Sequence, residues 1–260
     1  MRGELLQGKI CIVTGGTQGL GKGIALHLAE EGAEGIVICG RNAQNGENAA
    51  KEIRDSGCAC EYVQADLTIE ADCRNVVHTC DQKFGRINGL VNAAGNTKRG
   101  TLDDTTVALW DEIFAINVRA PFILMQETAR VMKREQKGGS IVNIISDTCY
   151  GGKPYITPYS ASKGALATLT KNVAHSLLLN RIRVNGINMG WTATPQEHKN
   201  QKYMGQPDNW LEKADAAQPF GRLLRPRDIA YLIAYLLSDR SEMMTGALVD
   251  FDQKVMGAWD

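Results

Sequence analysis

Short apolar runs that alternate with helical segments constrain the fold of this 260-residue chain more than any other feature. The apolar run Lys9–Val13 precedes a glycine-rich turn, after which Leu20, Ile24 and Leu28 recur at the four-residue spacing of a helix. The same order of strand and helix then repeats along the chain. This regular alternation favours a parallel sheet whose two faces are covered by helices.

The expected elements follow one another without an internal repeat or an obvious linker. Further strands are expected at Gly35–Cys39, Cys60–Ala65, Asn88–Asn92, Ser140–Ile145, Arg183–Ile187 and Ala247–Phe251. Helices are expected at Ala43–Ser56, Glu70–Phe84, Ser160–Leu179 and Pro226–Leu237, with two more across Thr105–Gln136. We therefore expect residues 1–260 to form a single α/β domain with a doubly wound parallel sheet.

One segment interrupts the alternation. Trp191–Gln218 is polar and weakly periodic, and it contains Pro195 and Pro207. A loop of this length in a compact domain is usually a lid or a binding loop. We expect a substrate loop at about residues 191–218.

Composition argues against several classes of protein. The 29 basic and 29 acidic side chains cancel, so no electrostatic footprint for nucleic acid or an anionic membrane is visible. The segment Met1–Lys9 carries charges where a signal peptide would have an apolar core. The seven cysteines are scattered, without the paired CxxC motifs of a zinc site. We expect a cytoplasmic protein with reduced thiols, no metal site, and no nucleic acid or membrane partner.

The turn after the first strand is rich in glycine and reads Thr14-Gly15-Gly16-Thr17-Gln18-Gly19-Leu20-Gly21. Glycines let the backbone turn sharply and approach a pyrophosphate, whose charge then meets the N-terminus of the following helix. A generic strand–helix turn would also contain glycine. The position of this turn, between the first strand and the first helix, favours a dinucleotide cofactor and a Rossmann fold.

The residues after the second strand bear on the choice of cofactor. An acidic residue there would accept hydrogen bonds from the ribose of NAD(H), whereas an arginine would accommodate the 2′-phosphate of NADP(H). The chain has Cys39-Gly40-Arg41-Asn42 at this point and no acid. Arg41 could instead be a solvated loop residue, or it could stack on adenine. We favour NADP(H) over NAD(H).

A tyrosine and a lysine four residues apart begin the long helix after the fifth strand. Tyr159 and Lys163 share one helical face, and a nearby ammonium would favour the phenolate and lower the tyrosine pKa. Ser146 ends the fifth strand, at the edge where parallel sheets bind ligands. Such a pair is common on helix surfaces, so its significance comes from its combination with the nucleotide turn.

Taken together, these residues resemble the short-chain dehydrogenase/reductase family along essentially the whole chain. Thr14–Gly21 matches the family's TGxxxGxG turn, and Asn92-Ala93-Ala94-Gly95 is similar to its NNAG motif. Asn117 falls in Ile116-Asn117-Val118, where the family keeps an asparagine. The catalytic spacing of the family is matched by Ser146, Tyr159 and Lys163, and Asp66 resembles its adenine-contacting aspartate.

The resemblance implies a mechanism in which hydride passes directly between nicotinamide and a substrate carbon. Tyr159 would be the general acid or base, Lys163 would lower its pKa and bind the nicotinamide ribose, and Ser146 would orient the substrate oxygen. Asn117 would support a water that relays protons through Lys163. The expected cofactor-binding residues are Gly15, Thr17, Gln18, Gly19, Leu20, Gly21, Arg41, Asn42, Asp66, Leu67, Asn92, Ala93, Gly95, Tyr159, Lys163, Gly190, Thr192 and Thr194.

One departure from the family lies after the sixth strand, where Asn188-Met189-Gly190 replaces the usual Pro-Gly. Gly190 keeps a flexible turn, and Thr194 still falls where the family contacts the nicotinamide carboxamide. The substrate pocket is expected among polar residues, with Ser146, Thr148, Tyr155 and Trp191 as substrate contacts. Further candidates are Asp147, Cys149, Gly152 and Asn96, whereas His198 is expected to be exposed. This lining suits a polyol, sugar or hydroxy acid, although loop residues are commonly polar in any case.

The helical regions Thr105–Gln136 and Ser160–Leu179 carry more apolar side chains than one sheet face would bury comfortably, including Phe122 and Leu177 to Leu179. We therefore expect a homo-oligomer, a dimer or a tetramer. The main functional hypothesis is an NAD(P)(H)-dependent oxidoreductase that interconverts a secondary alcohol and a ketone. The alternative is a catalytically silent nucleotide-sensing protein, but such a chain should have lost Tyr159 or Lys163. A related isomerase or dehydratase would need an added substrate domain.

Overall fold

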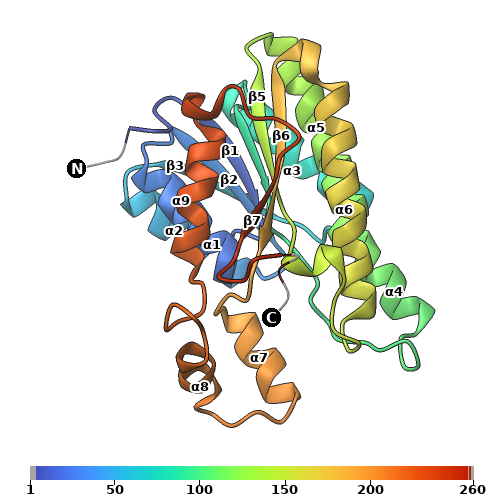
Figure 1. Cartoon of the computed structure of the whole chain (residues 1–260). Helices are drawn as coiled ribbons and strands as arrows, with labels where there is room; N and C mark the ends of the chain where they lie inside the picture. The colour runs from blue at the N-terminus through green and yellow to red at the C-terminus, as the bar shows by residue number, and fades with distance from the viewer. Residues whose placement is uncertain (1–3, 257, 259–260) are drawn as a thin grey trace.

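The computed structural model describes residues 4–256 and 258 of the chain. Seven parallel strands of this described part form one sheet in the order β3-β2-β1-β4-β5-β6-β7 (Figure 1). The strands are β1 (Ile10–Thr14), β2 (Gly35–Gly40), β3 (Ala59–Gln64), β4 (Gly89–Asn92), β5 (Gly139–Ile144), β6 (Ile182–Met189) and β7 (Leu248–Phe251). The strand order reverses between β1 and β4. This arrangement confirms the doubly wound α/β fold and opens a crevice at the carboxyl edge of that point.

Helices cover both faces of the sheet (Figure 1). They are α1 (Gly19–Glu30), α2 (Ala43–Asp55), α3 (Glu70–Phe84), α4 (Val107–Phe114), α5 (Ala120–Glu135), α6 (Thr157–Ser176), α7 (Pro195–Tyr203), α8 (Trp210–Ala216) and α9 (Pro226–Leu237). One apolar core joins α1, α2 and α9 to the sheet, and a second joins α3, α5 and α6 to its other face. Because helices cover both faces of the sheet, a ligand can reach the sheet only at the ends of its strands.

The central strands β1 and β2 are buried because their side chains are almost all apolar. Ile10, Ile12 and Val13 of β1 have no exposed surface, and neither do Ile36 and Ile38 of β2. Since a parallel sheet covered on both faces buries both sides of each strand, continuous apolar runs suit it better than alternating ones. The sheet therefore provides a rigid base for the loops at its carboxyl edge.

The two helices expected across Thr105–Gln136 are α4 and α5, and they are joined by a wide helical turn. The π-helical segment Ala115–Arg119 carries the chain from one to the other without a loop. Asn117 lies in this turn and is fully buried. An inserted turn of this kind changes the direction of a side chain, and such turns occur frequently at functional sites.

The segment expected as an irregular substrate loop contains two helices, α7 and α8, which project beyond one end of the sheet (Figure 1). The Thr194 hydroxyl accepts a hydrogen bond from the Glu197 N–H at 3.1 Å, which caps α7, and Pro195 occupies the first turn. Trp210 begins α8 and is 6% exposed. The sequence pattern was weak because few side chains of either helix are buried. No helix among residues 4–256 is long and apolar enough to cross a membrane.

Candidate active site

A cavity of about 570 Å³ lies at the carboxyl edge of the sheet, under α7. The glycine-rich turn, the ends of β2 and β3, the loop after β4, and the segments after β5 and β6 all contribute to its wall. The expected residues that line this cavity are Gly15, Thr17, Gln18, Gly19, Leu20, Gly21, Arg41, Asp66, Leu67, Ala93, Gly95, Ser146, Thr148, Tyr155, Tyr159, Lys163, Gly190, Trp191, Thr192 and Thr194. Residues far apart in the sequence therefore converge on one site.

The glycine-rich turn has the close packing that a phosphate cradle needs. Gly15 has a φ of +65°, and an added Cβ there would lie 3.0 Å from the Cα of Ala94. A Cβ on Gly21 would lie 2.3 Å from the carbonyl oxygen of Gly15. The Thr14 hydroxyl accepts hydrogen bonds from the N–H groups of Ala93 and Ala94, both at 3.0 Å, which ties the turn to the loop after β4. This tightly built turn opens α1, so its N–H groups fit a pyrophosphate.

Arg41 and Asp66 lie at the far end of the cavity, at the ends of β2 and β3. Arg41 is exposed, and its guanidinium contributes to holding the pKa of Asp66 below its usual range. The larger cause is a hydrogen bond that the Asp66 carboxylate accepts from the N–H of Thr68. The carboxylate is thus ionised and oriented, and the guanidinium beside it is free to meet an anionic group.

Two of the expected cofactor residues do not line the cavity. The Asn42 side chain caps α2 by accepting a hydrogen bond from the Asn45 N–H at 2.8 Å. Asn92 is buried and donates to the Asn143 side chain at 2.8 Å, in the core between β4 and β5. Their neighbours Arg41 and Ala93 reach the cavity instead, because adjacent residues of an extended chain point in opposite directions.

Ser146, Tyr159 and Lys163 come together at the middle of the cavity. Ser146 follows β5 by two residues, and Tyr159 lies in the first turn of α6, one turn before Lys163. The Lys163 ammonium is 5.6 Å from the centre of the Tyr159 ring and donates a hydrogen bond to the Ile144 carbonyl at 2.7 Å. The Ser146 hydroxyl donates to the Asp147 carboxylate at 3.0 Å. A strand end and a helix start thus place a hydroxyl, a phenol and an ammonium around one space.

Burial controls the ionisation of this group. It raises the pKa of the Tyr159 phenol to about 12, against a smaller lowering by a hydrogen bond with Ser146. It also lowers the pKa of the Lys163 ammonium to about 8. The sequence suggested that Lys163 would bring the tyrosine pKa down, but desolvation is the larger effect in the chain without ligands. At neutral pH the phenol therefore holds its proton, and Lys163 is mostly protonated but gives up its proton more easily than an ordinary lysine.

Asn117 does not line the cavity but holds its wall. Its side-chain amide donates to the Asn96 carbonyl at 3.0 Å and to the Ser162 hydroxyl at 2.9 Å. Its oxygen accepts the Asn96 N–H at 2.8 Å. The side chain thereby fixes the loop after Gly95 against α6, immediately behind Lys163. These three hydrogen bonds explain why a polar asparagine side chain can be fully buried in the wide helical turn.

On the substrate side, Thr148, Tyr155 and Trp191 lie where the sequence placed them. Asp147 and Asn96 also line the cavity, whereas Cys149, Gly152 and His198 do not. His198 is exposed, as expected, although its ring accepts a hydrogen bond from the indole of Trp210 at 3.1 Å. The sequence interpretation missed Arg99 and Glu197, which form an ion pair across the pocket wall at 3.3 Å. Glu197 reaches the cavity because it lies in the first turn of α7, a helix that the sequence interpretation did not expect.

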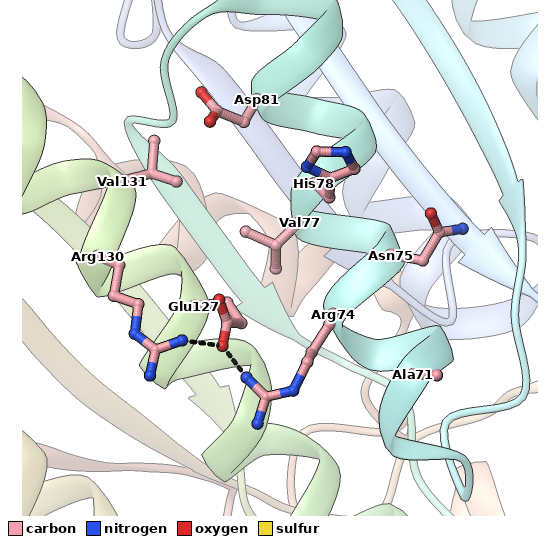
Figure 2. Close-up of a pocket in the computed structure, with 9 residues that line it drawn as sticks. All are labelled: Ala71, Arg74, Asn75, Val77, His78, Asp81, Glu127, Arg130 and Val131. Atoms are coloured by element: carbon pink, nitrogen blue, oxygen red, sulfur yellow. Dashed lines mark hydrogen bonds and ion pairs between the residues drawn. The ribbon is translucent and has the colours of Figure 1, made fainter.

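A second hollow, of about 390 Å³, lies between α3 and α5 and contains none of the expected site residues. Figure 2 shows Glu127 between Arg74 and Arg130, which both donate to its carboxylate. Arg134 is bound to Asp81 nearby, at 2.7 and 2.8 Å. The charged groups of this hollow are paired with one another or with Arg134. These ion pairs link α3 to α5.

Comparison with known proteins identifies the family. Residues 15–253 match the family model described as enoyl-(acyl carrier protein) reductase. The chain is 35% identical to the NADP-dependent (R)-specific alcohol dehydrogenase of Lentilactobacillus kefiri, over 94% of this chain and 95% of that protein. It is 31% identical to the cis-4-hydroxycyclohexanecarboxylate dehydrogenase of Sinomonas cyclohexanicum, over 96% of this chain and 97% of that protein.

A solved structure is also similar. A short-chain type dehydrogenase/reductase from Mycobacterium ulcerans superposes with a TM-score of 0.86 at 28% identity, over 95% of this chain and 90% of that one. The chain belongs to the short-chain dehydrogenase/reductase family. It is an NAD(P)-dependent oxidoreductase that acts on CH–OH groups.

Proposed function

We propose that this enzyme interconverts a small polar secondary alcohol and its ketone with NADP(H), and that Tyr159 is its general acid or base. The observation that carries this proposal is the meeting of Ser146, Tyr159 and Lys163 in the cavity that also contains the glycine-rich turn. A bound nicotinamide would supply or accept the hydride. The residues of the chain have to position the substrate oxygen and move one proton.

In the direction of reduction, the proton comes from Tyr159. Because burial raises the pKa of the phenol to about 12, the proton is present at neutral pH and is available to the developing alkoxide. Ser146 holds the same oxygen with its hydroxyl. In the direction of oxidation, Tyr159 must first lose its proton, and a positive charge on Lys163 would favour that loss. Asn117 positions the loop that faces Lys163.

The preference for NADP(H) rests on Arg41. The end of β2 carries this exposed guanidinium and no carboxylate, so a 2′-phosphate would meet a positive charge there, and the same guanidinium offsets the negative charge of Asp66 at the end of β3. A ribose hydroxyl would lack the acidic acceptor that NAD(H) sites usually supply. The similar enzyme from Lentilactobacillus kefiri is NADP-dependent, which supports the same choice.

The proposed homo-oligomer would use the face formed by α4, α5 and the end of α6. Several apolar side chains of the expected surplus are absorbed by the chain's own core, among them Leu124, Met125 and Leu177. Others remain exposed, including Val107, Trp110, Phe122 and Leu179. Exposed apolar side chains on neighbouring helices are typical of a contact surface. A dimer or tetramer would be seen as a two- or fourfold mass in light scattering, and a monomer would refute it.

The decisive test measures nicotinamide absorbance with NADP⁺ and NAD⁺ in parallel, against polyols, aldoses, hydroxy acids and simple secondary alcohols. The carbonyl compounds are offered with NADPH and NADH in the same way. Turnover that requires Tyr159 and prefers NADP(H) supports the proposal. Tight cofactor binding without turnover of any alcohol or carbonyl would favour the nucleotide-sensing alternative.

A further inference from the structure

Arg99 stands on the pocket wall with unused hydrogen-bonding capacity. It lies in the loop after Gly95, and its guanidinium is 5.7 Å from the centre of the Tyr155 ring. The side chain is 20% exposed, and within residues 4–256 its buried Nε has no hydrogen-bond partner. Leaving a buried donor unpaired costs free energy, so an acceptor on a molecule bound in the pocket would be stabilised by this donor.

The ion pair of Arg99 with Glu197 does not satisfy the guanidinium. Only Nη2 takes part, at 3.3 and 3.4 Å from the two carboxylate oxygens, whereas charge-assisted hydrogen bonds are normally about 2.7–2.9 Å long.

Glu197 is held without Arg99. It accepts neutral N–H groups at 2.7 Å from Gln201, 2.9 Å from Trp191 and 3.0 Å from Asn200. The carboxylate is thus fixed, and the guanidinium can turn its remaining donors toward the cavity.

A second cation lies beside Arg99 at this end of the cavity. Lys153 lies 5.9 Å from the Tyr155 ring centre, on the same aromatic side chain that Arg99 covers, and lines the cavity. Lys98 is neutralised by Glu112, at 2.6 and 2.9 Å. The acid nearest the reacting group is Asp147, which accepts the Ser146 hydroxyl. Arg99 also lowers the pKa of Tyr159, which places its charge within electrostatic reach of the reacting oxygen.

We propose that Arg99 binds the carboxylate of the substrate, so that the enzyme acts on hydroxy acids and the corresponding keto acids. This inference rests on the proposed alcohol–ketone chemistry at Tyr159. In reduction, hydride from the cofactor forms the new C–H bond, the carbonyl π electrons move to oxygen, and oxygen takes the Tyr159 proton. The carboxylate does not react. A planar guanidinium suits it because two parallel N–H groups can meet its two oxygens.

The experiment uses a ladder of keto acids, each paired with its neutral primary amide. Pyruvate, acetoacetate, 4-oxopentanoate and 5-oxohexanoate move the carboxylate progressively further from the carbonyl, while each amide keeps the size and removes the charge. NADPH consumption gives kcat/KM for every member. Calorimetry with the enzyme–NADP⁺ complex gives the affinity for each acid and amide independently of turnover. We expect one acid of the ladder to exceed its amide about 10- to 100-fold in both quantities.

Substitutions assign that preference to Arg99. In Arg99→Met the acid-to-amide ratio should fall to about one, and in Arg99→Lys it should be partly retained, because a lysine keeps the charge but not the bidentate geometry. Lys98→Met is the matched control: it removes the adjacent cation, which is already neutralised, and should leave the ratio unchanged. A purely electrostatic effect of Arg99 on Tyr159 would shift the pH profiles of acid and amide alike, and the ratio would not move.

The outcomes separate this inference from the proposed function. Amides that bind and react as well as every acid would overturn the role of Arg99 while the oxidoreductase proposal stands. An acid preference that persists in Arg99→Met would overturn it as well. Selective binding of an acid through Arg99, without reduction of any ketone, would support the carboxylate site and reject the proposed reaction for these ketones.

Discussion

The cofactor side and the substrate side of the cavity are built by different means. The cofactor side rests on the ends of β1 and β2 and on the start of α1, where a glycine-rich turn packs against backbone atoms at contact distance. The substrate side is formed by side chains of the loop after β4 and of α7, and a half-exposed Trp191 covers it. Backbone atoms define one side of the cavity, and side chains define the other. We therefore expect substitutions on the first side to act on every substrate, and those on the second to act selectively.

Tyr159 lies between the two sides, and its replacement should give the largest effect. Tyr159→Phe removes the only phenolic proton of the reacting group while it keeps the ring. We expect kcat to fall about 100- to 10,000-fold, because general acid–base catalysis is lost for all substrates. NADPH binding, measured by fluorescence titration, should change only a few-fold. A variant that keeps more than about a tenth of the activity would remove Tyr159 from its proposed role.

Gly21 tests the backbone side. A Cβ at Gly21 would lie 2.3 Å from the Gly15 carbonyl oxygen, so Gly21→Ala must displace the phosphate turn. We expect the Kd of NADPH to rise at least about tenfold and the free energy of unfolding to fall by about 1–3 kcal/mol. Gly164→Ala in α6 is the control, because a Cβ there makes an ordinary 3.4 Å contact with the Cys149 carbonyl oxygen. Equal cofactor affinity in both variants would contradict a tightly packed cradle.

Lys163 should make stability depend on pH. Its pKa is about 8 in the folded chain, against an ordinary value of 10.5, so the unfolded chain binds this proton more tightly. Stability must therefore rise as pH increases through that interval. Between about pH 7 and about pH 11, wild type should gain up to about 3 kcal/mol relative to Lys163→Met, which has no such proton. Urea unfolding of both proteins over this range tests it, and a constant difference would show that Lys163 is not desolvated.

Arg41 tests the choice of cofactor. Arg41→Ala removes the only cation at the end of β2 that lines the cavity in the described chain. We expect KM for NADPH to rise about tenfold, because the 2′-phosphate loses a charge-assisted hydrogen bond, while KM for NADH changes little. Steady-state kinetics with both cofactors measure the ratio. A parallel rise for both would mean that Arg41 only stacks on adenine.

The same division explains what the sequence predicted. Strand–helix alternation and ordered motifs predicted where Ser146, Tyr159, Lys163 and the glycine turn lie in the fold, because periodicity and spacing determine where the backbone runs. Their roles stay a prediction. The alternation and the motifs could not give the direction of single side chains, so Asn42 was expected at the cofactor although it caps α2. The start of α7 did carry a signal: Thr194-Pro195-Gln196-Glu197 has a capping threonine and a proline in the first turn. This capping signal predicts a helix at α7, and that helix would have identified Glu197 as a candidate site residue. Arg99 lies in a loop without periodicity, where only the fold reveals its neighbours.

Trp191 tests the side-chain side and should give the smallest effect. Its ring stacks on Trp210 at 6.0 Å, and its indole N–H donates to Glu197 at 2.9 Å. Trp191→Ala should raise the substrate KM about three- to tenfold through lost packing and a looser Glu197, with no change in the Kd of NADPH. Tyr203→Ala removes an 85% exposed aromatic from the end of α7, the helix that follows Trp191, and serves as its control. If Trp191→Ala weakened cofactor and substrate equally, the two sides of the cavity would be coupled, since α7 would then close over both.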